Sequence, residues 1–143
     1  MTTIRLARAN DGPAIGKLLA DADYTDYGVD WSMVNPAGWW LLAEEADELI
    51  GVAQVIIAKP YGYIGEFAVR PESRGRRDGV GCLSKTGGDV AADLYYMALR
   101  VLQLGGSTLT FAWVDTENIG IKDMLRPLGW TAVGEFTLMV KRV

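Results

Sequence analysis

The sequence contains no histidine and only one cysteine, Cys82. Without histidine there is no His-based catalytic triad, no imidazole metal ligand and no imidazole general base near neutral pH. One cysteine cannot form an internal disulfide, and because no Cys/His cluster exists we expect no metal site. We interpret Cys82 as a small apolar helix residue rather than a nucleophile. Any catalytic acid or base must come from Asp, Glu, Tyr, Lys, Cys82 or water.

Long apolar segments are also missing. The longest runs, such as 'VIIA' at residues 55–58, are far shorter than the roughly 20 residues that span a bilayer. The N-terminal stretch 'MTTIRLARAND' lacks the apolar segment of a signal peptide. Together with the cysteine content, these absences predict a soluble, cytoplasmic protein with no membrane partner.

Basic residues are in the minority. The chain has 14 Lys and Arg against 18 Asp and Glu, a formal net charge of −4. Proteins that bind mainly nucleic acid need a basic face to neutralise phosphates, so this balance argues against a nucleic-acid partner. The composition is globular, with 50% hydrophobic and 22% charged residues, and a length of 143 residues predicts a single domain, 1–143.

Hydrophobic periodicity predicts an α/β (α+β) fold with a mixed, mostly antiparallel central sheet of six to seven strands flanked by about four helices. The first two strands of a central meander are expected to form a hairpin, and Trp39 and Trp40 at its start are predicted core residues. The predicted strands are 3–8, 39–45, 48–58, 61–70, 107–114 and 131–143, and the predicted helices are 10–22, a short one within 23–38, 80–103 and 117–129.

The stretch 'VRPESRGRRDGVG', residues 69–81, is rich in arginine and glycine. Glycines let backbone N–H groups converge on an anion, a helix N-terminus attracts negative charge, and arginine side chains match phosphate oxygens. The alternative is a solvated charged turn. Because the stretch leaves a predicted strand and enters a predicted helix, we favour a phosphate-binding loop.

Two segments resemble motifs of the GNAT superfamily of acyl-CoA-dependent N-acetyltransferases. The first is 'AVRPESRGRRDGVG', which is similar to the family's strand ending in Val-x-Pro followed by Arg/Gln-x-x-Gly-x-Gly/Ala. The second is 'NIGIKDMLRPLGW', which looks like the family's helix-to-strand segment. The matching or similar positions are Arg76, Gly79 and Gly81 in the first motif and Asn118, Leu128, Gly129 and Trp130 in the second.

The resemblance implies acetyl-CoA as the cofactor and two central strands, ending at Val69 and lying at 107–114, that splay apart around its pantetheine arm. It also implies a direct transfer of the acetyl group to a primary amine of a small molecule, peptide or protein. The residues that it assigns to the cofactor are Ala68, Val69, Arg70, Arg74, Arg76, Arg77, Gly79, Val80, Gly81 and Asn118.

Direct transfer needs a proton acceptor, because an alkyl ammonium is almost never a nucleophile at pH 7. Glu66 lies on the strand before the loop, where many family members have a catalytic glutamate, and Asn118 is the second implied catalytic residue. The alternatives are an outward polar residue for Glu66 and a helix cap for Asn118. The acceptor amine is expected to bind acidic and aromatic residues of the segment 23–38, although an acidic surface with core aromatics is the simpler alternative. These residues are Tyr24, Asp26, Tyr27 and Trp31.

The chain departs from the family pattern in two ways. Leu125 stands where the family often has a tyrosine acid, so the proton for the leaving sulfur would come from Tyr61, Tyr63, Tyr95, Tyr96 or water, or CoA would leave as thiolate. The loop is also two residues longer than usual. The pyrophosphate could therefore meet the amides of residues 79–81 or, if the helix starts after a cap at Asp89, those of 87–88.

Two other functions remain open from the sequence. Leu125 would also suit a non-catalytic acyl-CoA-binding module, and the arginine cluster would suit an enzyme that modifies nucleic acid bases. A homodimer is compatible with the sequence.

Overall fold

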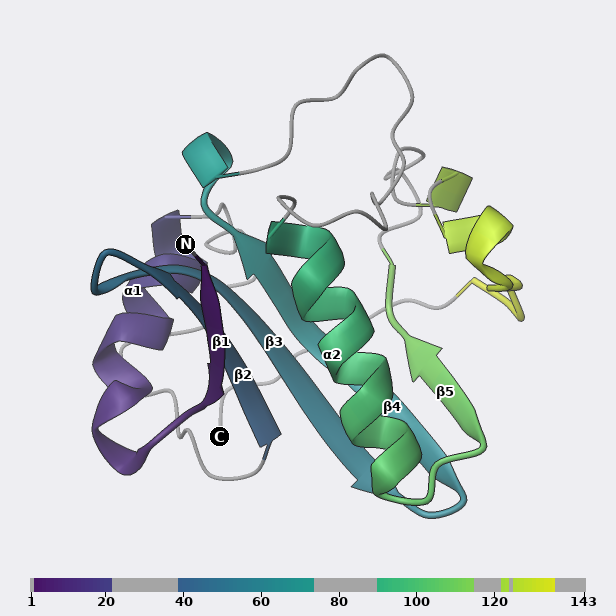
Figure 1. The fold of residues 1–143 in the computed structure, drawn as a ribbon. Coiled ribbons are helices and arrows are strands. Elements are labelled where there is room, and N and C mark those ends of the chain that lie inside the picture. Colours follow the sequence, from purple (N-terminus) through teal and green to yellow (C-terminus); the bar gives the residue numbers. More distant parts are fainter. Residues whose placement is uncertain (1, 22–38, 74–89, 115–121, 124, 136–143) are drawn as a thin grey trace, which may run out of the picture.

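The computed structural model describes residues 2–21, 39–73, 90–114, 122–123 and 125–135. They form a five-stranded sheet in the order β1-β2-β3-β4-β5, antiparallel except for the parallel pair β4 and β5. Helix α2 crosses one face of this sheet, and α1 covers the other (Figure 1). The strands are β1 (Thr3–Leu6), β2 (Trp39–Glu45), β3 (Glu48–Ala58), β4 (Tyr61–Val69) and β5 (Leu109–Ala112); the helices are α1 (Gly12–Asp21) and α2 (Val90–Leu104), with short 3-10 turns η1 (Ala9–Asp11), η4 (Pro71–Ser73) and η5 (Arg126–Leu128).

The sequence predicted the mixed α+β class but not the number of elements. Five predicted strands are confirmed, whereas the described part of the chain contains five strands and two α-helices instead of six to seven strands and about four helices. The strand predicted at 131–143 is not formed over 131–135, where every residue is exposed. Gly134 weakens this stretch as a strand, because glycine offers no side chain to pack. The short helix predicted within 23–38 lies outside the described residues.

Strands β2 and β3 form the hairpin that the sequence predicted, with Ala46 and Asp47 as its two-residue turn. Ala46 and Asp47 have φ angles of 50° and 62°. Such left-handed residues are typical of the turns whose twist matches paired strands. The turn fixes the register in which Trp40 lies opposite Gln54.

Alternate strand residues supply two separate hydrophobic cores, as the period of two in a strand requires. The α2-side core lies between the sheet and α2, and the α1-side core lies beneath α1. The α2-side core contains Leu41, Ala43, Ile50, Ala53, Val55, Ile64, Val69, Val90, Ala92, Leu94, Tyr95, Ala98 and Leu102. The α1-side core contains Ile15, Leu18, Leu19, Trp40, Leu42, Val52 and Ala68.

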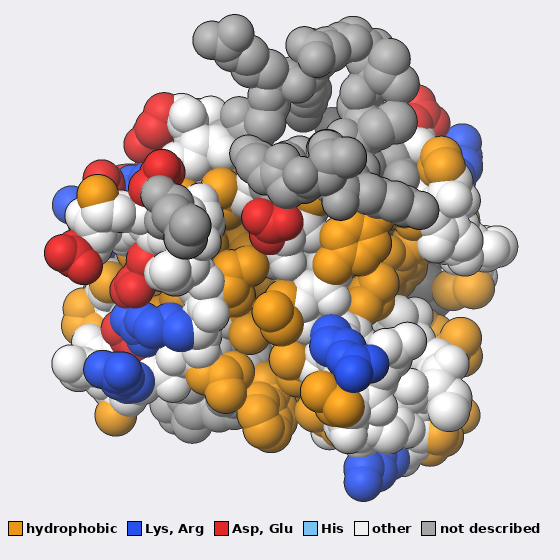
Figure 2. Space-filling view, viewed as in Figure 1, with side chains coloured by type: hydrophobic (Ala, Val, Ile, Leu, Met, Phe, Trp, Pro, Cys, Tyr) orange, Lys and Arg blue, Asp and Glu red, His pale blue; other side chains and the backbone are white. Residues whose placement is uncertain are grey.

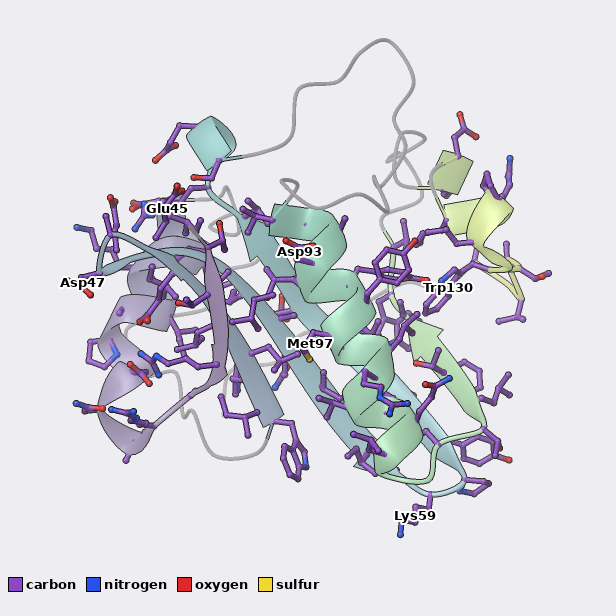
Figure 3. All side chains as sticks on the ribbon, in the orientation of Figure 1. Glu45, Asp47, Lys59, Asp93, Met97 and Trp130 are labelled. Atoms are coloured by element: carbon purple, nitrogen blue, oxygen red, sulfur yellow. The ribbon has the colours of Figure 1, made fainter. Side chains whose placement is uncertain are left out.

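The face that carries α2 is hydrophobic across its middle, and several acidic side chains gather at its left edge (Figure 2). Figure 3 labels Glu45 and Asp47 at that edge, Met97 on α2 and Trp130 on the segment beside α2. Met97 is 41% exposed, so α2 buries only the side that meets the sheet and its neighbours. Among the described helices, none combines the length and apolarity needed to cross a membrane.

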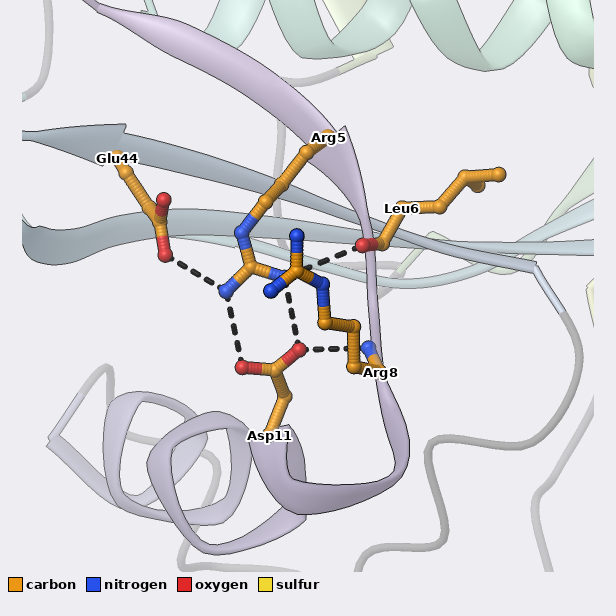
Figure 4. Close-up of polar contacts among 5 residues, drawn as sticks. All are labelled: Arg5, Leu6, Arg8, Asp11 and Glu44. Carbon is orange, nitrogen blue, oxygen red and sulfur yellow. Dashed lines mark hydrogen bonds and ion pairs between the residues drawn. The ribbon is translucent and has the colours of Figure 1, made fainter.

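An arginine joins β1 to β2 and to the turn before α1 (Figure 4). The Arg5 guanidinium donates two hydrogen bonds to Asp11, at 2.8 and 2.9 Å, and one to Glu44 at 2.7 Å. Asp11 also accepts the Arg8 backbone N–H at 2.6 Å. The hydrogen bonds from Arg5 are the main cause that lowers the pKa of Asp11 to about 2.

We predict that Asp11→Asn lowers the free energy of unfolding by about 1 kcal/mol at pH 7, because it removes a charge-assisted pair. The folded pKa of Asp11 lies below its ordinary value of 3.8, so the stabilisation is present above that value and is lost as pH falls toward 2. Urea unfolding at pH 7 and pH 2.5 should show the wild-type advantage shrinking at the lower pH. Glu45→Gln, at an exposed strand end, is the control; an equal loss in both variants would contradict the prediction.

Candidate active site

Strands β4 and β5 are paired over only part of the length of β4. Their register runs from Tyr61 opposite Leu109 to Ile64 opposite Ala112, where β5 ends. Strand β4 continues to Val69. Among the described residues, the second half of β4 therefore has no strand paired with it on the β5 side, and we call this edge of β4 the opening.

A β-bulge lies at the point where this pairing ends. Ala53 faces Phe67 and Val55 faces Ile64, so Gln54 alone lies opposite two residues of β4, Gly65 and Glu66. The Gln54 side-chain oxygen accepts the Glu66 N–H at 3.4 Å. A bulge bends its strand and increases the local twist, which turns β4 away from its partner.

Gly65, at the first position of the bulge, leaves room for the end of the Gln54 side chain. A Cβ atom on Gly65 would lie 2.4 Å from the Gln54 amide oxygen. Without a Cβ at residue 65, the Gln54 side chain can lie across the bulge and reach the backbone of Glu66.

Glu66 lies on the face of the sheet that α1 covers. Ala68, two residues further on, belongs to the α1-side core, and side chains two apart on a strand share a face. Trp40, Gln54 and Glu66 therefore form a cross-strand row on this face. Burial raises the pKa of the Glu66 carboxyl. The buried indole N–H of Trp40 has no hydrogen-bond partner within the described part of the chain, so the row offers a donor, an amide and a carboxyl.

On the other face, Tyr95 of α2 meets Trp130. The Trp130 indole N–H donates a 2.6 Å hydrogen bond to the Tyr95 hydroxyl, and the ring centroids lie 6.4 Å apart. Gly129 ends η5 with a φ of 92°, and Trp130 N–H bonds back to Leu125 O at 3.3 Å. This left-handed helix end directs Trp130 toward α2. Burial raises the pKa of Tyr95, and the bond from Trp130 opposes that rise.

The sequence profile described as "Acetyltransferase (GNAT) family" matches residues 10–81, half of the chain. The chain belongs to the GNAT acetyltransferase family. No curated protein matches the sequence.

Solved structures share the fold over nearly the whole GNAT chain. A transcriptional regulator from Bacillus halodurans C-125 has a TM-score of 0.74 at 16% identity, covering 99% of this chain and 100% of that one. The aminoglycoside acetyltransferase AAC(6')-Iy, in complex with a CoA bisubstrate analogue, has a TM-score of 0.69 at 17% identity, covering 100% and 99%. Ribosomal-protein-alanine N-acetyltransferase from Brucella melitensis has a TM-score of 0.67 at 15% identity, covering 99% and 100%.

Most of the predicted site residues of this GNAT chain lie outside the described residues. These are Tyr24, Asp26, Tyr27, Trp31, Arg74, Arg76, Arg77, Gly79, Val80, Gly81 and Asn118. Helix α2 is described from Val90, so the choice between residues 79–81 and 87–88 as the anion-binding amides stays open.

The three predicted residues at the end of β4 differ in orientation. Arg70 N–H donates to Ile50 O at 2.8 Å, and Arg70 O accepts the Ser73 N–H at 2.9 Å. Because backbone groups alternate along a strand, those of Ala68 also point toward β3, whereas those of Val69 point toward the opening beside β5. Of the three, Val69 has its backbone on the side of the opening.

The Arg70 side chain connects elements of the fold. Its Nε donates to Leu49 O at 2.8 Å, and its Nη1 lies 3.1 Å from an Asp21 carboxylate oxygen. The side chain is only 16% exposed. Arg70 therefore ties the end of β4 to β3 and to the end of α1.

Sequence reasoning missed Gln54 and the row that it forms with Trp40 and Glu66. The signal was present in Gly65 next to a charged residue inside an otherwise apolar strand, since an isolated strand glycine often marks a bulge. Trp40 is a core residue as predicted, whereas Trp39 is 44% exposed.

We predict that Arg70→Ala lowers the free energy of unfolding by about 2 kcal/mol, since a charged donor to a partly buried carbonyl is lost. Its affinity for CoA should stay within about twofold of wild type, because the side chain is engaged by the fold. Urea unfolding and calorimetric titration with CoA measure the two effects. Arg126→Ala breaks an exposed 3.5 Å pair with Asp123 and should cost about 0.5 kcal/mol or less. Loss of CoA binding in a stably folded Arg70→Ala would reverse this assignment.

Proposed function

We propose that this GNAT protein transfers an acetyl group from acetyl-CoA directly to a primary amine of a small molecule, peptide or protein. The observation that carries the proposal is Glu66, a half-buried carboxyl with a raised pKa at the point where β4 and β5 separate. The fold relatives include proteins described as an aminoglycoside acetyltransferase with a CoA analogue and a ribosomal-protein-alanine N-acetyltransferase, and both descriptions name acceptors that carry amines.

The cofactor in this proposal lies along the opening beside β4. The backbone of Val69 lies on the side of that opening, so we place Val69 and its neighbour Ala68 beside the pantetheine arm. Arg70 contributes to the fold instead, because its backbone groups already have partners. The pyrophosphate would bind the loop side chains and amides of Arg74, Arg76, Arg77, Gly79, Val80 and Gly81, with Asn118 as a further contact.

In the reaction, Glu66 takes a proton from the acceptor ammonium, directly or through water. The amine nitrogen then attacks the thioester carbonyl carbon, and a backbone N–H stabilises the oxyanion. Burial moves the pKa of the Glu66 carboxyl toward neutral pH, and a general base is most effective when its pKa lies near the working pH. The Trp40–Gln54–Glu66 row would line the acceptor side together with Tyr24, Asp26, Tyr27 and Trp31. Asn118 remains a proposed catalytic residue.

CoA binding is tested first by thermal unfolding. A site filled at 100 times its Kd adds about 2.7 kcal/mol of stability, so millimolar CoA should raise the Tm by several degrees. Adenosine at the same concentration is the control, since it lacks the pantetheine and pyrophosphate. An unchanged Tm in millimolar CoA would rule out the cofactor assignment. A shift without release of thiol from acetyl-CoA across a broad amine panel would favour a non-catalytic binding module.

Glu66→Gln is predicted to lower kcat by about 10² to 10⁴ at pH 7, because it removes the general base. The CoA-induced Tm shift should stay, since the Glu66 side chain lies on the face opposite α2. In the wild type, kcat should rise with pH through a pKa above the usual glutamate value of 4.5, because burial raises it and the base acts deprotonated. Glu72→Gln, the same substitution at an exposed position, is the matched control. Unchanged turnover in Glu66→Gln would remove Glu66 from the mechanism.

A further inference from the structure

Acyl transfer from a thioester leaves a sulfur atom that gains an electron pair and needs a proton. Leu125, beside the opening of the sheet, packs against the α2-side core and offers no proton. Tyr61 meets Phe111 edge-on, with ring centroids 5.9 Å apart, and Tyr63 stacks on the same ring at 5.4 Å, where β4 and β5 are still paired. Among the described tyrosines, Tyr95 and Tyr96 of α2 remain.

Tyr95 lies over the second half of β4. Leu102 packs directly on Gly62, because a Cβ there would lie 2.4 Å from Leu102 Cδ2. Tyr95 precedes Leu102 by two helical turns, about 10 Å, which corresponds to roughly three strand residues. Its neighbour Leu94 packs on Gly51, which pairs with Val69. Both contacts put Tyr95 above the stretch of β4 that has separated from β5.

The hydrogen bond from Trp130 prepares the Tyr95 hydroxyl to give up its proton. The oxygen accepts the indole N–H at 2.6 Å, so its own O–H must point away from Trp130. The same bond stabilises the phenolate that remains after transfer. The Tyr96 hydroxyl is buried and finds no hydrogen-bond partner among the described residues, so a phenolate there would receive no bond like the one that Trp130 gives to Tyr95.

We propose that Tyr95 protonates the leaving sulfur and that Trp130 is the positioning residue that holds its hydroxyl. This inference rests on the proposed acetyl transfer. The C–N bond forms, the C–S bond breaks with its electron pair going to sulfur, and the Tyr95 proton passes to sulfur to give the thiol. Glu66 passes to solvent the proton that it took from the ammonium, and the nitrogen loses its second proton to solvent as the amide forms. The phenolate regains one proton from solvent, so one proton is released in each turnover.

The base and the acid then act from opposite faces of the sheet. Glu66 shares its face with the α1-side core, whereas Tyr95 belongs to the α2-side core. The thioester in the opening between β4 and β5 is reached by the amine from one face, and the sulfur is protonated from the other. This arrangement keeps the two proton transfers apart, so Tyr95 does not protonate the attacking amine.

Tyr95→Phe keeps the ring in the core and removes the hydroxyl. We expect kcat for acetyl transfer to fall by about 10², with the KM for acetyl-CoA and the CoA-induced Tm shift within about twofold of wild type. Tyr96→Phe, the adjacent residue on α2, should keep kcat within about twofold. The assignment would be overturned if kcat of Tyr95→Phe equalled that of the wild type, or if kcat fell further in Tyr96→Phe than in Tyr95→Phe.

The pH profile separates proton donation from packing. Replacing Tyr95 by 3,5-difluorotyrosine acidifies the phenol, so kcat should acquire a descending limb at mildly alkaline pH; the same replacement at Tyr96 should not produce one. Adding Trp130→Phe should move that limb to higher pH, because the lost N–H no longer stabilises the phenolate. Proton donation by Tyr95 would be refuted if the descending limb were absent from the kcat profile. The positioning role of Trp130 would be refuted if Trp130→Phe left the pH of that limb unchanged. A wild type that neither binds CoA nor releases thiol would refute the proposed function itself.

Discussion

Gln54 lays its amide oxygen across β4 where a side chain on residue 65 would otherwise stand. The rest of the site depends on this contact. With two residues of β4 opposite one of β3, the strand bends, and its pairing with β5 ends at Ile64. Gly65 and Gln54 are therefore one structural unit, although they lie on different strands.

The bulge also decides which side chains face which way. Before it, Gly62 and Ile64 face α2; after it, Phe67 and Val69 pack against the α2-side core, and Ala68 packs beneath α1. The extra residue shifts the alternation along β4 by one position. Glu66 therefore faces the α1 side, and the apolar side chains that follow it still match the faces of β3. A carboxyl is thus held in a half-buried position without interrupting either core. Its raised pKa is a consequence of that position.

The local fold was largely predictable from the sequence, whereas the geometry of the site was not. The meander, its first hairpin and helix α1 follow from short-range sequence patterns, which do not depend on residues far away in the chain. Gly65 signals a bulge in β4, but the residue of β3 that lies opposite it depends on the register between the strands, which one strand's sequence does not encode. Arg70 was predicted at the cofactor because it follows the motif's strand, but its contacts with Leu49 and Asp21 are long-range and invisible in the motif.

Burial at the edges of the structure was also hard to predict from the sequence, because it depends on which elements pack against an edge. Leu6 alternates with Arg5 as a core residue would, yet it is 46% exposed, because β1 is the edge strand and α2 lies over β2, β3 and β4. Periodicity says which face a residue shares with its neighbours but not whether anything covers that face. The stretch 131–135 was expected to be strand on its pattern alone and has no coverage either.

Trp130 illustrates how a chain can keep a chemical function while changing the residue that performs it. The left-handed helix end at Gly129 aims the following side chain at α2 whatever that side chain is. With tryptophan there, the contact gains an N–H that a phenylalanine ring lacks, and Tyr95 supplies the matching acceptor. Our proposal assigns the proton to this hydroxyl of α2, because Leu125, which packs against the same core, offers none. In the mechanism we propose, the proton donor lies on α2, which precedes β5, rather than on the segment that follows β5.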